Sequence, residues 1–268
     1  MKILFLTPIF VFFFISCSNS DSGTEKSEVQ STDSSEVVAD TLADSVVIPE
    51  LSEDLVSLLQ KKTKEYDLPF ELDSVGFAKL SEAIDQRLNS EEIKLLSQNL
   101  LDHEYTEEVK WRVEHLLKME ERKRKGEYEE YLNSLDIGML RDIEASMGPV
   151  LRIDEHSFMI LWKIEYGSYE ACPYYSGTLI IASLVYQNEL KNSVLIGEVS
   201  GGADAPVWGD TEVYSTIESK GIRSIRKDRS CEGDEDEEGN EIIEEKTTDS
   251  YIPIEGTGFR VEKEGNSK

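Results

Sequence analysis

Two loops in the second half of the chain combine aromatic rings with carboxylates. They span Ser168–Gly177 and Gly201–Asp210. If neighbouring strands carry both loops to one end of a sheet, the rings and carboxylates would suit a sugar or a cationic peptide. The alternative is that Gly and Pro shape the turns and the rings only close the end of the sheet. The candidate ligand-binding residues are Glu170, Tyr174, Tyr175, Asp204, Trp208 and Asp210.

A third loop, Asp234–Glu245, partly matches the calcium-binding pattern D-x-[DN]-x-[DN]-G-x5-E. Calcium prefers several oxygen ligands, which clustered carboxylates around a Gly turn can supply. The sequence departs from the pattern because Glu241 stands where an apolar residue is usual, and because the flanks have the pattern of strands. The alternative is a solvated acidic hairpin tip. The candidate calcium ligands are Asp234, Asp236, Glu238 (in place of the usual Asp or Asn) and Glu245.

Motifs of familiar catalytic sites are missing from the sequence. His103 begins H-E-Y-T-E, in which Glu107 stands where the second zinc-binding histidine of H-E-x-x-H would be. There is no G-x-S-x-G elbow, phosphate-binding P-loop or dinucleotide fingerprint. Cys172 would be a nucleophile only with His156 beside it and without a disulfide. We therefore expect a non-catalytic protein more than an enzyme.

Residues 1–17 have the order of an export signal. Lys2 precedes an almost unbroken apolar run, Ile3–Ile15, which is shorter than the ~20 apolar residues that span a bilayer. The following tetrapeptide, Phe14-Ile15-Ser16-Cys17, resembles the lipobox of bacterial lipoproteins, although Phe14 stands where Leu is usual. The resemblance implies cleavage after residue 16 and acylation of Cys17. The alternative is an ordinary cleaved signal in which this cysteine is incidental.

Residues 17–50 are expected to form a lipidated, disordered tether. Ser18–Glu50 is rich in Ser, Asp, Glu and Thr, has no aromatic residue, and contains Lys26 as its single base. Such a segment buries too little apolar surface to fold, and as a flexible coil it spans ~30 Å. Lipoproteins that stay in the inner membrane often have Asp after the acylated cysteine. Because Ser18 takes that position, the resemblance favours the outer membrane.

The charge and the cysteines restrict the partners and the compartment. A net charge of -27 repels phosphate backbones and anionic headgroups, so we expect no nucleic-acid binding and membrane attachment only through acyl chains. If Cys17 is acylated, one pair of cysteines remains in an oxidising compartment. A Cys172–Cys231 disulfide would close a loop of ~60 residues and add ~4 kcal/mol of stability. The alternative is two free, buried thiols.

The apolar pattern predicts helices before sheet. Over residues 51–148, apolar residues recur at helical spacing in four successive stretches, with Ser52, Asp73 or Ser74, Ser90 and Thr106 at the starts. Another helix is expected over Tyr128–Leu140. From residue 149 to 264 the pattern changes to short Val-, Ile-, Tyr- and Thr-rich strands separated by turn residues, and residues 265–268 form a tail. The fold class is α+β, with an N-terminal helical array and an antiparallel β-meander that forms a sandwich or a partly closed barrel.

These features together predict a lipid-anchored protein of the cell envelope that binds or assembles with an envelope protein or a glycan. The competing hypothesis is an enzyme that hydrolyses envelope glycans with Asp204 and Asp210 as its carboxylates. A third option is a structural protein stabilised by Ca²⁺ at the acidic loop.

Overall fold

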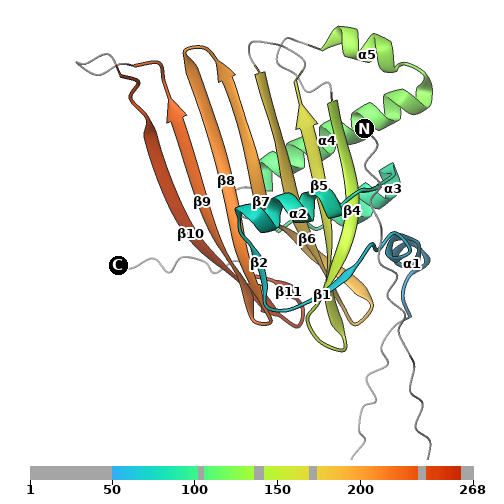
Figure 1. Cartoon of the computed structure of the whole chain (residues 1–268). Helices are drawn as coiled ribbons and strands as arrows, with labels where there is room; N and C mark the ends of the chain where they lie inside the picture. The colour runs from blue at the N-terminus through green and yellow to red at the C-terminus, as the bar shows by residue number, and fades with distance from the viewer. Residues whose placement is uncertain (1–49, 102–105, 136–141, 169–173, 235–239, 261–268) are drawn as a thin grey trace, which may run out of the picture. The chain divides into compact units, whose positions relative to one another are not determined.

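A computed structural model describes residues 50–101, 106–135, 142–168, 174–234 and 240–260, all within one compact unit (Figure 1). These residues form an α+β fold with five helices and one sheet of eleven strands. No helix among them is long and apolar enough to cross a bilayer. The helices are α1 (Glu53–Leu59), α2 (Ser74–Ala83), α3 (Ser90–Ser97), α4 (Thr106–Lys125) and α5 (Tyr128–Ser134). The strands are β1 (Glu65–Asp67), β2 (Phe70–Leu72), β3 (Gln86–Arg87), β4 (Asp142–Arg152), β5 (Ser157–Gly167), β6 (Tyr174–Tyr186), β7 (Glu189–Asp204), β8 (Val207–Glu218), β9 (Gly221–Cys231), β10 (Glu244–Glu255) and β11 (Gly258–Phe259).

The sheet is open and almost wholly antiparallel. Its strand order is β1-β4-β5-β6-β7-β8-β9-β10-β11, with β2 paired to β8 and β3 paired to β4 outside this path. Only β1 pairs with β4 in parallel among the described strands. The seven long strands from β4 to β10 follow one another in sequence and space, so the predicted meander is present. The sheet does not close into a barrel.

A first apolar core lies between one face of the sheet and the helices that cover that face. Apolar side chains of α1, α3 and α4, including Leu58, Leu96 and Leu116, pack against β4, β5 and β6. Trp162 of β5 lies in this core and is fully buried. Its indole N–H donates to Ser183 Oγ at 2.9 Å, so the large ring is buried without an unsatisfied donor.

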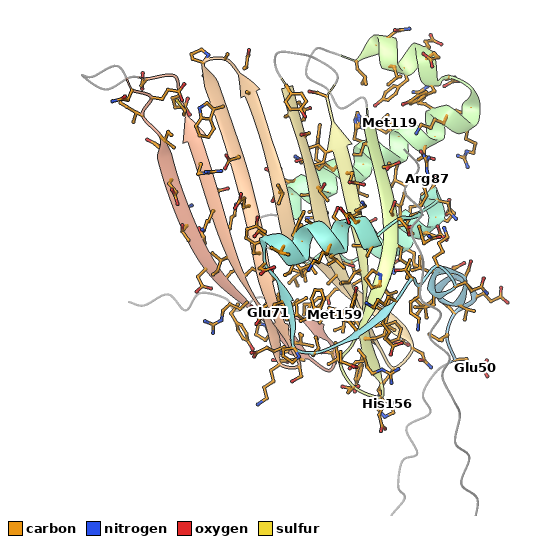
Figure 2. All side chains as sticks on the ribbon, in the orientation of Figure 1. Glu50, Glu71, Arg87, Met119, His156 and Met159 are labelled. Carbon is orange, nitrogen blue, oxygen red and sulfur yellow. The ribbon has the colours of Figure 1, made fainter. Side chains whose placement is uncertain are left out.

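A second core lies on the other face, under α2 and β2. Leu72, Phe77 and Leu80 pack there against apolar residues of β5, β6 and β7. Ile217 and Ile252, from β8 and β10, join the same core. Figure 2 labels Met159 of the second core, near β2, and Met119 of the first core, on α4. Because both faces of β5 are covered, its sequence is almost continuously apolar instead of alternating.

The structure differs from the sequence-based expectation in the first half of the folded part. Three short strands, β1, β2 and β3, interrupt the region 51–148 that was expected to be helical, and β4 begins at Asp142, before the expected boundary at residue 149. Strands of two or three residues are too short to show an alternating pattern. Their pairing with β4 and β8 holds them in place. The helix expected over Tyr128–Leu140 ends at Ser134.

Candidate ligand-binding cleft

A polar cleft of about 320 Å³ lies between α4 and the end of the sheet that carries the β7–β8 hairpin. Glu108 and Arg112, one helical turn apart on α4, form one wall. Strands β5 to β9 supply the rest of the lining. The lining residues on the strands are Tyr166, Tyr175, Glu198, Ser200, Gly201, Gly209, Asp210, Thr211, Asp228, Arg229 and Ser230.

A buried ionic network lies at the cleft. The side chain of Glu198 is only 2% exposed, and its Oε2 is 3.2 Å from Nη1 of Arg226, which is 12% exposed. Ser200 donates to Glu198 Oε1 at 2.6 Å. Nε of Arg226 also donates to both oxygens of Asp228, at 2.8 and 3.0 Å, and Thr211 donates to Asp228 at 2.8 Å. Burial raises the pKa of Glu198, and the Ser200 hydrogen bond and the Arg226 charge oppose that rise.

Arg112 connects α4 to the sheet. Its guanidinium carbon lies 4.0 Å from the centre of the Tyr166 ring, and Nη2 donates to the Tyr166 hydroxyl at 2.8 Å. Nη1 is 3.6 Å from a carboxylate oxygen of Glu108. Burial raises the pKa of Tyr166, and the charge of Arg112 opposes the rise. Nε of Arg112 is buried and has no acceptor among the described residues. Through its hydrogen bond and its ring contact, the guanidinium of Arg112 fixes the position of Tyr166 at the cleft.

Glycines on the strands make space for the tyrosine rings. A Cβ built on Gly177 would lie 2.5 Å from the Tyr166 hydroxyl oxygen, and one built on Gly202 would lie 2.7 Å from Cβ of Tyr175. A Cβ on Gly209 would meet its nearest atom, the Arg229 carbonyl oxygen, at 3.4 Å, which is an ordinary contact. A glycine within a strand often marks close approach of a ring, a backbone or a ligand. Two of these glycines accommodate tyrosines, whereas Gly209 leaves bare backbone in the cleft.

The structure brings some of the predicted ligand-binding residues together and separates others. Tyr175 lines the cleft on the face of the sheet that α4 covers. Asp210 also borders the cleft, but it lies two residues after Trp208 on β8, so its carboxylate is on the opposite face, where it pairs with Arg229. Tyr174 and Trp208 are each paired across the sheet with Ala203, so they share a face, and alternation places Tyr175 on the opposite face. Trp208 donates to Glu241 at 3.2 Å, and Tyr174 is 47% exposed. Asp204 is exposed at the end of β7, and Glu170 lies outside the described residues.

The carboxylates of the cleft are all close to arginines. Asp210 accepts two hydrogen bonds from Arg229, at 2.8 and 2.9 Å, in a bidentate pair. With the pairs already described, every carboxylate in the lining lies within 4 Å of an arginine nitrogen. The pairs are Glu108–Arg112, Glu198–Arg226, Asp228–Arg226 and Asp210–Arg229. The arrangement can offer hydrogen bonds to a ligand, but it holds no unpaired carboxylate among its described lining residues.

Sequence patterns alone did not single out Arg112, Tyr166, Glu198 or Arg226. Arg112 lies within an amphipathic helix, and the other three lie within strands, where a single charged residue or tyrosine is common. One signal was present. Glu198 follows the apolar run Val194–Gly197 in a strand that is buried on both sides, and a buried carboxylate in such a place requires a partner.

The calcium and disulfide predictions fall partly outside the described residues. Asp234 and Glu245 are exposed, whereas Asp236 and Glu238 are not described. Within the part of the chain that the structure describes, no group of three or more His, Cys, Asp or Glu residues could hold a metal ion. Cys231 is buried and unpaired there, and neither Cys172 nor Cys17 is described. The bridge and the calcium site therefore stay predictions.

Two other hollows differ in character from the cleft. One, of about 260 Å³, lies between α1, β1 and the β4–β5 hairpin, where Glu65 pairs with Lys62 and Arg152. The other, of about 510 Å³, is bordered by Glu165, Thr178 and Val199, which are paired across the sheet and so share the face opposite to α4. Neither contains a buried ionic network like that of Glu198.

No protein-family model, curated protein or solved structure matches this chain. A function for the chain can therefore be inferred only from the residues of the cleft and from the sequence pattern of residues 1–17.

Proposed function

We propose that the protein is a lipid-anchored binding module of the bacterial cell envelope. Acyl chains on Cys17 hold it at the outer membrane, residues 17–50 form the tether, and the cleft under α4 binds a polar envelope ligand without catalysis. The lipobox resemblance supports the anchor. A second acyl chain makes such anchoring stable, because each buried CH₂ contributes ~0.8 kcal/mol.

One observation carries the binding proposal: the cleft is rich in hydrogen-bonding groups, yet every carboxylate in it is paired with an arginine. A glycan hydrolase needs one carboxyl group that donates a proton and one carboxylate that attacks or activates water. Asp210 would have to leave its bidentate pair with Arg229 to do either, and Asp204 is exposed at the end of β7 rather than among the cleft residues. Binding is therefore favoured over hydrolysis.

The anchor is tested by mass spectrometry of the protein isolated from membranes. We expect a mature N-terminal peptide that begins at Cys17 and carries acyl chains, and we expect Cys17→Ala to appear in the soluble fraction. An unmodified Cys17 in membrane-associated protein would refute the anchor.

The cleft is tested by filling it. Gly209→Leu places a side chain where the backbone is bare, whereas Gly167→Leu adds the same side chain at the end of β5, outside the cleft, where the atom nearest to the new Cβ is 3.9 Å away. We expect a detergent extract of the host envelope to raise the melting temperature of the full-length wild type and of the Gly167 variant. The Gly209 variant should fold but show no rise. If all three proteins respond equally, the ligand binds elsewhere.

A further inference from the structure

The charges of the cleft restrict the class of ligand. Two arginines, Arg112 and Arg226, lie at or beneath its surface on the side of α4, and each is within ion-pair distance of at least one carboxylate. Arg229 pairs with Asp210 on the opposite face of the sheet. An anionic ligand would have to compete with Glu198 and Asp228 for Arg226 or with Glu108 for Arg112, and a cationic ligand would have to draw Glu198 or Asp228 from Arg226. Breaking a buried ion pair leaves an uncompensated charge at high cost. The cleft is therefore poorly suited to phosphates and to basic peptides.

The uncharged groups of the cleft suit a polyhydroxylated ring. The Ser200, Thr211 and Ser230 side chains carry hydroxyls on adjacent strands. Ser200 and Thr211 already donate to Glu198 and Asp228, so toward a ligand their oxygens act as acceptors. Charged groups that already have partners still offer strong hydrogen bonds to neutral hydroxyls, because a carboxylate can accept and a guanidinium can donate several.

The aromatic side of the cleft suits the apolar face of the same kind of ring. Tyr175 lines the cleft, and its backbone is fixed by two hydrogen bonds to Ser168, from Tyr175 N–H to Ser168 Oγ and from Ser168 N–H to Tyr175 O, at 3.0 and 2.9 Å. The face of a tyrosine ring is electron-rich and attracts the weakly positive C–H groups of a sugar. Gly209 exposes backbone in the same cleft, so a flat ring can approach it.

We infer that the ligand of the cleft is an uncharged glycan, of which one or two sugar rings are bound against Tyr175 and Gly209. This inference rests on the proposed binding function and names its ligand class. The cleft volume of about 320 Å³ is at the lower end of the range for small-molecule sites, which is consistent with the binding of one or two sugar rings.

Fractionation of the envelope extract tests the ligand class. The extract is treated with protease, freed of lipid with organic solvent, and passed over anion- and cation-exchange columns. We expect the activity that stabilises the full-length protein to remain in the flow-through, which contains neutral polysaccharide. Activity found only in the lipid, the protease-sensitive or a column-bound fraction overturns the glycan inference but leaves the binding function intact. If no fraction and no whole extract stabilises the protein, the binding function itself fails.

Calorimetric titration with purified oligosaccharides locates the contact. The probes are cellotetraose, chitotetraose and mannotetraose as neutral chains, with tetragalacturonate as an anionic one. We expect binding of a neutral chain that does not change between low and high salt, because no ionic contact is screened. Tyr175→Ala should weaken it by at least about tenfold, equivalent to about 1.4 kcal/mol.

Tyr174→Ala is the matched control, since it removes the same side chain one residue earlier and on the opposite face of the sheet. It should leave the affinity unchanged. Equal losses in the two tyrosine variants, or binding of tetragalacturonate alone, would overturn the inference.

Discussion

At the scale of single residues, Glu198 and Arg226 form the pair on which the cleft depends most. Removal of Arg226 leaves a carboxylate that is 2% exposed without its cation. We expect Arg226→Met to lower the free energy of unfolding by roughly 3–5 kcal/mol, the usual cost of breaking a buried pair. Arg229→Met is the control, because Arg229 is 47% exposed in its pair with Asp210 and solvent-exposed pairs contribute little to stability. Urea unfolding of both variants measures the difference. Equal losses of unfolding free energy in the two variants would contradict the claim that the buried Glu198–Arg226 pair stabilises the fold more than the exposed pair does.

The raised pKa of Glu198 also predicts a pH dependence. Because folding raises this pKa above its ordinary value of 4.5, the folded state binds a proton more tightly than the unfolded state does. The contribution of Glu198 to stability is therefore fully present below pH 4.5 and decreases as the pH rises from there through the folded pKa. We expect the free energy of unfolding of the wild type, measured relative to Glu198→Gln, to fall across this range.

Measurement of both proteins by urea unfolding at a series of pH values isolates this one group, since the other carboxyl groups are shared by both proteins. A difference that is constant with pH, or that increases with pH, would show that Arg226 outweighs burial at this site.

The chemistry of the cleft was only partly predictable from residue types. Tyr175 and Asp210 were among the predicted ligand-binding residues because they belong to loops that combine aromatic rings with carboxylates. Arg112 and Tyr166 come together from a helix and a strand that are 54 positions apart in the sequence, and no local pattern indicates such a contact. Their meeting depends on how α4 lies across the sheet.

At the scale of elements, helices α1, α2 and α3 were predictable because each has an apolar stripe and a capping residue. Leu55, Leu80, Ile93 and Val113, one from each of the four stretches with helical spacing, are all buried. Ser52 and Asp73 cap α1 and α2 as expected, and α3 begins at Ser90 as expected, with Asn89, the residue before it, as its cap. Asn and Ser are equally good caps, so the sequence does not decide between neighbours.

The capping box of α3 gives a testable prediction. Asn89 accepts from the backbone N–H groups of Glu91 and Glu92 at 2.9 and 3.0 Å, and Glu92 accepts from the N–H of Asn89 at 2.7 Å. We expect Asn89→Ala to lower the free energy of unfolding by about 1 kcal/mol. Ser52→Ala should cost less, because its single capping bond to the N–H of Leu55 is longer, at 3.3 Å. Thermal or urea unfolding of the two variants makes the comparison, and a larger loss at Ser52 would contradict it.

At the scale of the whole folded part, the chain passes from α2 on one face of the sheet to α3 on the other. It does so beside β4, where Gln86 and Arg87 of β3 pair with Met147 and Ser146. This passage was not predictable, because Gln86 and Arg87 are too few to show a strand pattern. Gly148 lies next to it. A Cβ there would be 2.7 and 2.8 Å from two atoms of Ile84 and 3.0 Å from the carbonyl oxygen of Ala83.

The contact at Gly148 joins the two layers of helices through the sheet edge, so its disturbance should affect the whole fold. The backbone of residues 83 and 84 cannot yield easily, because Ile84 is fully buried in the second core and its N–H donates to Leu80 at 3.0 Å. We expect Gly148→Ala to lower the free energy of unfolding by about 1–3 kcal/mol, as overpacking of a filled core does. Gly167→Ala adds the same methyl group where the nearest atom is 3.9 Å away, and should be neutral or slightly stabilising. Urea unfolding of the Gly148→Ala and Gly167→Ala variants measures the difference. Similar stabilities in both variants would mean that α2 is free to move relative to β4. The two cores would then not be held together at this edge.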